Sequence, residues 1–183
     1  MLTKTLIAVA IIAVILVVVI ALQPTDFRIA RSTTIAAPPA VVFEQVNDLH
    51  KWEEWSPWAK VDPHMKSRYE GTPSGPGASY AWIGNSEVGE GRMTITESRP
   101  NDLIGIKLEF VKPMACTNAV EFTFKPEGSS THVTWTMTGR NSFMGKAVGL
   151  VMNMDKMCGG MFEKGLASMK SLVEAGSTSQ ASL

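Results

Sequence analysis

The sequence contains few of the residues that build covalent or metal-held frameworks. Its 183 residues include two cysteines, Cys116 and Cys158, and three histidines, His50, His64 and His132. Two cysteines fit neither a disulfide framework nor a zinc site, so they are free thiols or form a single bridge. No two histidines have metal-ligand spacing, and none has an acidic partner or nucleophile suited to general-base chemistry. We therefore expect no metal and no cofactor.

An excess of charge is also missing. Seventeen basic residues balance seventeen acidic ones, so no electric field attracts nucleic acid or acidic lipid, and a nucleic-acid partner is not expected. The segment Gly71–Gly77 is rich in glycine but leads into a strand. A phosphate cradle needs a helix after the glycines, so we predict a turn there.

Long apolar runs are absent, with one exception at the N-terminus. Leu6–Leu22 contains only Leu, Ile, Val and Ala. With Thr5 included, a helix of this length spans about 27 Å, close to the roughly 30 Å hydrocarbon core of a bilayer. We predict that residues 1–23 form a single-pass transmembrane anchor. A cleaved signal peptide is the alternative, although its apolar stretch is usually about 7–15 residues.

The orientation of this anchor is almost balanced by its flanking charges. Lys4 lies on one side and Arg28 and Arg31 lie on the other, so the positive-inside rule gives a tie. The short basic start resembles an export signal, which favours a soluble domain on the extracytoplasmic, periplasmic side.

Residues 24–176 show the pattern of one α+β domain. Period-two alternation predicts a strand at Phe27–Ile35, and Pro38-Pro39 begins a helix with Val42, Phe43 and Val46 on its apolar face. Six more strands are predicted at Met65–Gly71, Ala78–Gly84, Gly89–Ser98, Leu103–Val111, Thr117–Lys125 and Thr131–Arg140. The last two alternate clearly between apolar and polar residues, which is typical of an antiparallel sheet covered on one face.

The C-terminal third is helical. Apolar residues recur at three- and four-residue steps from Val151 to Val173, which predicts a long amphipathic helix that ends at Gly176, with residues 177–183 as a disordered tail. Gly159-Gly160 lies inside this helix and indicates either a kink or a close approach of sheet or ligand to the helix backbone. Phe143–Met154 is apolar and short, and could form a lid over a cavity mouth. A seven-stranded curved sheet with one apolar face needs a cover, and only the long helix is large enough to provide it.

Three sequence segments resemble a known superfamily. They are Ile35-Ala36-Ala37-Pro38-Pro39-Ala40-Val41-Val42-Phe43, Trp52-Glu53-Glu54-Trp55-Ser56-Pro57-Trp58 and Phe162-Glu163-Lys164-Gly165-Leu166-Ala167-Ser168-Met169-Lys170. Together with the element order, they resemble the SRPBCC superfamily, the START-like and pollen-allergen-like helix-grip group, in its polyketide cyclase/dehydrase-like branch. The resemblance covers Phe27–Ala175. It implies a domain that binds apolar or amphipathic ligands between sheet and long helix, and that in a few members uses this cavity for chemistry.

The first hypothesis is therefore a membrane-tethered binding or carrier domain for a lipid-like, polyketide-like or isoprenoid-like small molecule, of unknown oligomeric state. The residues expected to line the cavity are Trp55, Trp58, Trp82, Met93, Ile95, Leu108, Phe110, Phe122, Trp135, Cys158, Met161, Phe162 and Gly165. The alternatives are a cyclase or dehydratase in the same cavity and a structural domain whose cavity its own side chains fill.

The enzyme alternative requires an ionisable group inside the cavity, and Glu97 is the one candidate for a catalytic residue. It follows Met93 and Ile95 on the apolar side of its strand, where a carboxylate would need a partner and would have a raised pKa. If the alternation ends near Arg99-Pro100, however, Glu97 lies at the rim of the sheet.

Overall fold

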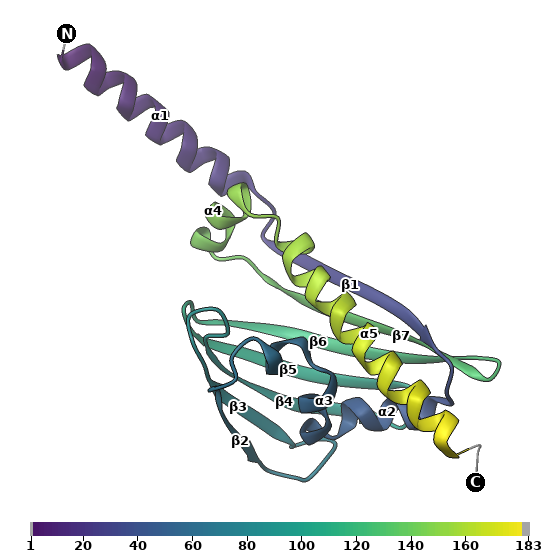
Figure 1. Ribbon diagram of the computed structural model, residues 1–183. Coiled ribbons are helices and arrows are strands. Elements are labelled where there is room, and N and C mark those ends of the chain that lie inside the picture. Colours follow the sequence, from purple (N-terminus) through teal and green to yellow (C-terminus); the bar gives the residue numbers. More distant parts are fainter. Residues whose placement is uncertain (1, 181–183) are drawn as a thin grey trace.

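The computed structural model describes residues 2–180, and it consists of a curved sheet, a long helix that crosses the sheet, and a second long helix that projects away from both (Figure 1). The elements in chain order are α1 (Leu2–Leu22), β1 (Asp26–Ile35), α2 (Pro39–Asn47), η1 (Leu49–Lys51), α3 (Trp52–Trp55), η2 (Pro57–Lys60), β2 (Lys66–Glu70), β3 (Ser79–Ile83), β4 (Glu90–Arg99), β5 (Leu103–Lys112), β6 (Cys116–Glu127), β7 (Ser130–Arg140), α4 (Phe143–Val151) and α5 (Met154–Gln180). The predicted order of strand, short helices, six strands and long helix is confirmed.

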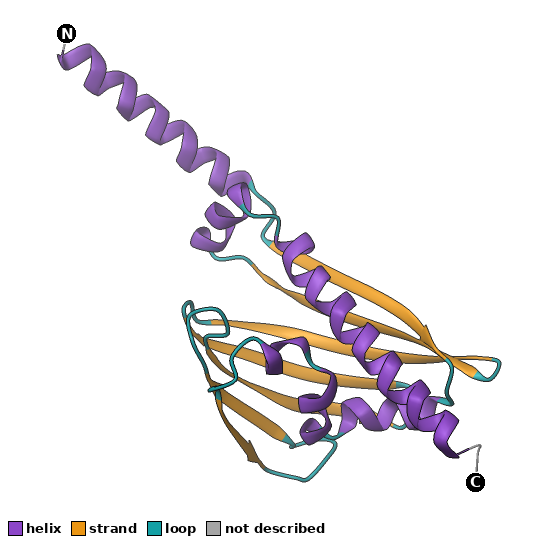
Figure 2. Ribbon diagram, viewed as in Figure 1, coloured by secondary structure: helices purple, strands orange, loops and turns teal. Residues whose placement is uncertain are grey.

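The seven strands form one antiparallel sheet in the order β1-β7-β6-β5-β4-β3-β2. Hairpin turns connect the successive strands from β2 to β7, and the first strand pairs with the last. Figure 2 shows that the helices of the domain lie on one side of this sheet. We call the side that faces α5 the inner face and the opposite side the outer face.

Side-chain alternation divides the strands between these two faces. On β7, Val133, Trp135 and Met137 are buried on the inner face, and the threonines between them point to the outer face. The apolar side of α5 covers the inner face with Phe162, Leu166, Met169 and Val173. The predicted helix-grip arrangement, a curved antiparallel sheet around a long C-terminal helix, is therefore confirmed.

Gly159 allows α5 to lie close to β1. A Cβ atom at Gly159 would collide with the guanidinium group of Arg31. That group donates hydrogen bonds to Glu163 Oε1 at 2.6 Å and to Asp155 Oδ2 at 3.0 Å, so it links the inner face of β1 to α5. The helix is continuous through both glycines. Of the two alternatives for Gly159-Gly160, the structure shows the close approach, made by a side chain from the sheet.

The end of α5 differs from the prediction. The helix continues through Gly176 to Gln180, so residues 177–180 are helical and not part of a disordered tail. One glycine costs a helix only about 1 kcal/mol relative to alanine, which does not force it to end. The remainder of the predicted tail, residues 181–183, lies outside the described residues.

A β-bulge changes the direction of the strand that carries Glu97. The register of β4 against β5 shifts between Ile95 and Glu97, because Ile95 pairs with Ile106 but Glu97 pairs with Gly105. An extra residue in one strand moves the following side chains to the other face. Glu97 therefore lies with the outward residues of β5, and its side chain is exposed.

Candidate ligand-binding groove

Aromatic rings fill the centre of the space between the inner face and α5. The indole of Trp135 stacks on the ring of Phe162 with a centroid distance of 4.2 Å, so β7 contacts α5 directly through these two rings. Trp52 and Trp55 pack edge-on against Trp135 at 6.0 and 5.7 Å. Phe122 closes the cluster at 4.8 Å from Trp135. The centre of the grip is thus packed with side chains of the protein itself.

The three clustered tryptophans occupy different depths. Trp55 is completely buried and Trp52 is 7% exposed, and their indole N–H groups donate to the carbonyl oxygens of Gln45 and Val46. Trp58 is half-buried and packs against Trp135 and Phe162 at 5.7 and 6.1 Å. Trp52 and Trp55 therefore plug the grip, while Trp58 stands at the edge of the plug.

Burial on the inner face decreases from the α2 end of the sheet to the end at which α1 and α4 lie. Along β5, Ile104 is fully buried and Ile106 is 3% exposed, but Leu108 and Phe110 are only half-buried. The same trend holds from Ile35 to Phe27 on β1 and from Phe122 to Cys116 on β6. The apolar inner face is consequently open to solvent beyond the aromatic plug.

We call this open region the mouth. It is formed by half-buried side chains from the sheet, from η2 and from the start of α5, which are Phe27, Trp58, Leu108, Phe110, Cys158 and Met161. Five of these residues were predicted to line a cavity. The other eight predicted residues are buried between the sheet and its cover: Trp55, Trp82, Met93, Ile95, Phe122, Trp135, Phe162 and Gly165.

Four residues of the groove were not selected from the sequence. Trp52 belongs to the plug, and Phe27, Asn118 and Met137 lie on the inner face at the mouth end. Phe27 and Met137 follow the same alternation as Ile29 and Trp135, so the period-two pattern carried this signal. Nothing in the sequence distinguishes the buried Asn118 from an asparagine in a turn.

Few polar groups lie among these apolar side chains. Trp135 is 2% exposed, and its Nε1–H has no hydrogen-bond partner among the described residues. Buried indole N–H groups usually find a partner. The Cys158 thiol lies in the mouth, and its pKa is raised above the ordinary 9.0 by burial and, second, by the nearby Asp155 carboxylate. Both cysteines are free thiols, so the alternative of a bridge between them is not realised.

The ionisable residues considered from the sequence lie outside the groove. Glu97 is exposed on the outer face, 3.6 Å from the guanidinium of Arg99. His132 Nδ1 lies on the same face, 3.2 Å from Thr34 Oγ1, and His64 is exposed. The exposed ring of His50 stacks on Tyr69 at 4.0 Å near the β2 edge of the sheet.

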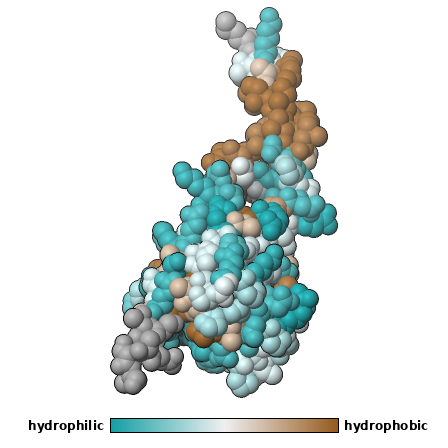
Figure 3. All heavy atoms as spheres, turned by 90° about the vertical axis from the view of Figure 1, so that its right-hand side faces the viewer, coloured by the Kyte–Doolittle hydropathy of each residue, from teal (hydrophilic) through white to brown (hydrophobic). Residues whose placement is uncertain are grey.

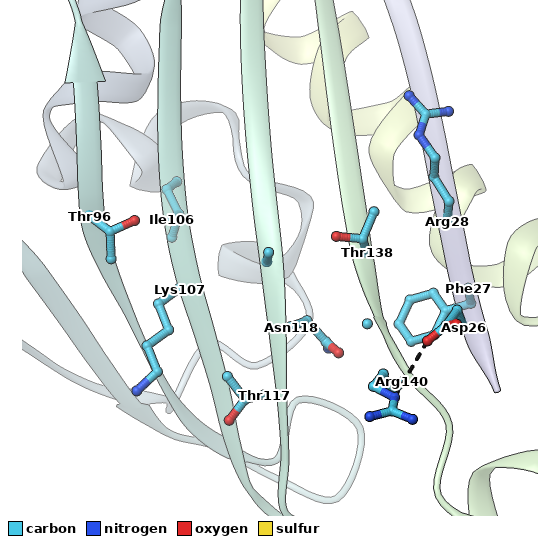
Figure 4. Close-up of a pocket in the computed structure, with 12 residues that line it drawn as sticks. Asp26, Phe27, Arg28, Thr96, Ile106, Lys107, Thr117, Asn118, Thr138 and Arg140 are labelled. Atoms are coloured by element: carbon cyan, nitrogen blue, oxygen red, sulfur yellow. Dashed lines mark ion pairs between the residues drawn. The ribbon is translucent and has the colours of Figure 1, made fainter.

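Neither of the two most pronounced hollows along residues 2–180 lies between the sheet and α5. One is an open depression of about 760 Å³ across β4, β5, β6, β7 and β1, where Figure 4 shows Lys107, Thr117, Thr138 and Arg140. Arg140 Nε and Asp26 Oδ1 are 3.5 Å apart there, and both side chains are more than 80% exposed. Such a saddle follows from sheet twist and offers no enclosed surface to an apolar ligand. The other hollow runs along α1.

The sheet, the gripped helix and the apolar mouth define this domain as a helix-grip domain with an inner face suited to apolar molecules. The sequence model of the family described as "Polyketide cyclase / dehydrase and lipid transport" matches residues 26–174. The chain therefore belongs to this family. No curated protein matches the sequence.

Solved structures agree with this fold. The chain is similar to protein CV1439 from Chromobacterium violaceum, with 15% identity, a TM-score of 0.57, and coverage of 82% of this chain and 99% of that one. It is also similar to Aha1 from Colwellia psychrerythraea, with 16% identity, a TM-score of 0.59, and coverage of 82% and 98%. The protein TTHA0849 from Thermus thermophilus gives 18%, 0.58, 82% and 99%. At such identities the likeness concerns the fold alone.

Proposed function

We propose that this protein is a membrane-tethered binding or carrier domain for an apolar or amphipathic small molecule, lipid-like or polyketide-like, which it holds in the mouth between the inner face and α5. The observation that carries this proposal is the decrease in burial along the inner face. Leu108, Phe110 and Phe27 remain half-exposed although they continue the rows of the buried core. A ligand there would complete the apolar core.

The size of the effect supports binding without chemistry. A ligand that buries about 300 Å² of apolar surface gains roughly 7.5 kcal/mol at 25 cal/mol/Å², before the costs of association. The unpartnered Nε1–H of Trp135 and the buried amide of Asn118 supply polar groups near this surface. Apolar walls with a few polar groups are typical of ligand sites, and they favour a ligand that carries a hydrogen-bond acceptor.

The anchor part of the proposal rests on α1. It is 21 residues long, has a mean hydropathy of 3.4 in its most apolar window and is almost entirely exposed, so its length and composition allow it to cross a membrane. A signal sequence passes the same test, and retention of α1 in the mature chain is part of what we propose. The export-like start supports a domain on the extracytoplasmic side.

Binding can be tested with a matched pair of variants in the full-length chain, reconstituted in phospholipid nanodiscs. Leu108→Gln places an amide on the inner wall of the mouth, and Lys107→Gln places the same amide on the outer face of the same strand. Energy transfer from tryptophan to a dansyl-labelled fatty acid reports binding. We expect Leu108→Gln to weaken binding about tenfold, which corresponds to about 1.4 kcal/mol, and Lys107→Gln to leave it unchanged.

Native mass spectrometry of the same samples would detect a molecule that co-purifies with the chain. If neither method finds an apolar ligand in the unmodified protein, the plug of aromatic side chains fills the fold completely and the domain is structural. Equal binding by both variants would place the ligand outside the mouth. For the enzyme alternative, no specific observation among the described residues speaks in its favour.

A further inference from the structure

The apolar surface of the chain does not stop where α1 ends. Figure 3 shows brown, hydrophobic atoms along α1 and at its junction with the domain, while the remainder of the visible face is mostly teal or white. Seven large apolar side chains between residues 143 and 157 are 39–85% exposed: Phe143, Met144, Leu150, Val151, Met152, Met154 and Met157. They belong to α4, to the start of α5 and to the turn between these helices. Monomeric domains in water rarely leave such a cluster uncovered.

Several contacts fix α4 against the last turn of α1. Lys146 Nζ donates to the carbonyl oxygen of Ala21 at 3.2 Å, which satisfies one of the free carbonyl groups at the helix end. The backbone N–H of Asn141, just before α4, donates to the carbonyl oxygen of Thr25 at 2.7 Å. Ile20 is the buried residue of α1, and α1 and α4 are in contact. The two helices therefore form a joint and not a loose tether.

This joint determines the depth of α4. If α1 crosses a bilayer, Leu22 lies near the membrane surface, and Ile20 is about 3 Å deeper along the helix. A helix in contact with these residues lies at the same level, between head groups and acyl chains. The one charged residue of α4 is Lys146, and it is engaged with the end of α1. No charge of α4 then opposes insertion of its exposed apolar side.

We propose that α4 and the first residues of α5 insert into the interface of the bilayer that α1 crosses, so that the mouth opens at the membrane surface. This inference rests on the proposed function, because it requires α1 to span a membrane. The occupant is lipid, and the attraction is apolar, in agreement with the balanced charge of the chain. A ligand would enter the mouth from the bilayer.

The test uses the full-length chain in phosphatidylcholine vesicles. In a background of Cys116→Ser and Cys158→Ser, a nitrobenzoxadiazole label is attached through Val151→Cys. The control label is attached through Ser129→Cys, in the exposed β6–β7 turn at the other end of the sheet, about 30 Å away by strand length. The vesicles contain lipids with a nitroxide quencher either near the head group or near the chain end, and carbonate extraction reports whether α1 holds the chain in the membrane.

An interfacial helix buries its apolar face about 5–10 Å deep, so the shallow quencher should act about twice as strongly as the deep one on the 151 label, and neither should act on the 129 label. A 151 label that no lipid quenches, in a chain that resists carbonate, overturns the inference and leaves the anchor intact. Blue-shifted emission without quenching also overturns it, because protein then covers α4. A chain that carbonate extracts refutes the anchor as well, while ligand binding is measured separately.

Discussion

The spacing between α5 and the aromatic plug depends on Gly165, and a substitution there gives a direct test of the packing. A Cβ atom at this position would lie 3.0 Å from Pro57 Cδ and 3.0 Å from Trp135 Cζ3. Both neighbours are ring atoms of buried or half-buried residues, so neither can swing away as a flexible side chain would. Gly160, in the same helix, has no atom within 4 Å of its hypothetical Cβ and provides a matched control.

The expected magnitude follows from two opposing effects. Replacing a helix glycine with alanine stabilises a helix by about 0.8–1.0 kcal/mol, and this gain is common to Gly160→Ala and Gly165→Ala. Overpacking a tight core site costs about 1–3 kcal/mol, and only Gly165→Ala incurs it. The difference between the two variants is therefore about 1–3 kcal/mol, in favour of Gly160→Ala. For a chain of this size, that separates the melting temperatures by roughly 2–12 °C.

Thermal unfolding of the full-length chain in nanodiscs, followed by tryptophan fluorescence, measures this difference. The α1 segment has no tryptophan, so the signal reports the plug and its surroundings. We expect Gly160→Ala to melt above the unmodified protein and Gly165→Ala to melt at or below it. Equal stabilisation by both substitutions would mean that α5 does not press against Trp135, and the packed plug described above would be refuted.

Three further predictions concern the mouth and the link between β1 and α5. Alkylation of Cys158 should continue to accelerate as the pH rises above 9.0, because burial raises the pKa of its thiol, and a bound dansyl-labelled fatty acid should slow it about threefold or more; mass spectrometry of the alkylated chain measures both. Trp135→Phe keeps the ring but removes the unpartnered N–H, so the urea midpoint without ligand should stay within about 1 kcal/mol, while ligand affinity falls about 2–10-fold in the energy-transfer assay. Hydrogen bonds from Arg31 hold the pKa of Asp155 below its ordinary 3.8, so their stabilisation is complete above about pH 4 and is lost as the pH falls through the lowered value; Asp155→Asn should flatten acid unfolding curves below about pH 4.

Each of these predictions has a result that would contradict it. Equal alkylation with and without the fatty acid would place Cys158 away from the ligand. Unchanged affinity in Trp135→Phe would show that its N–H does not contact the ligand. Acid unfolding of Asp155→Asn with the slope of the unmodified chain would show that the Arg31 link does not contribute to stability.

The sequence by itself determined the elements and their assembly. Alternation on β6 and β7 depends on nearest neighbours along the chain, and burial of one face of a strand fixes which residues lie together. The three- and four-residue period of α5 is equally local, as is the proline start of α2. The segments around Phe43, Trp55 and Gly165 added the superfamily resemblance, which the family match confirmed. The apolar run that became α1 was visible from composition alone.

Only the tertiary structure decided how the groove is filled and where it opens. The direction of Glu97 depends on one extra residue in the pairing of β4 with β5, and pairing across strands leaves no mark in a single sequence. Gly159 was explained by Arg31, which is distant along the chain. Whether Trp55 and Trp58 plug or border a cavity depends on how Trp135 and Phe162 stack, which is a packing result. The position of the mouth beside α1 and α4 likewise follows from the long-range pairing of β1 with β7.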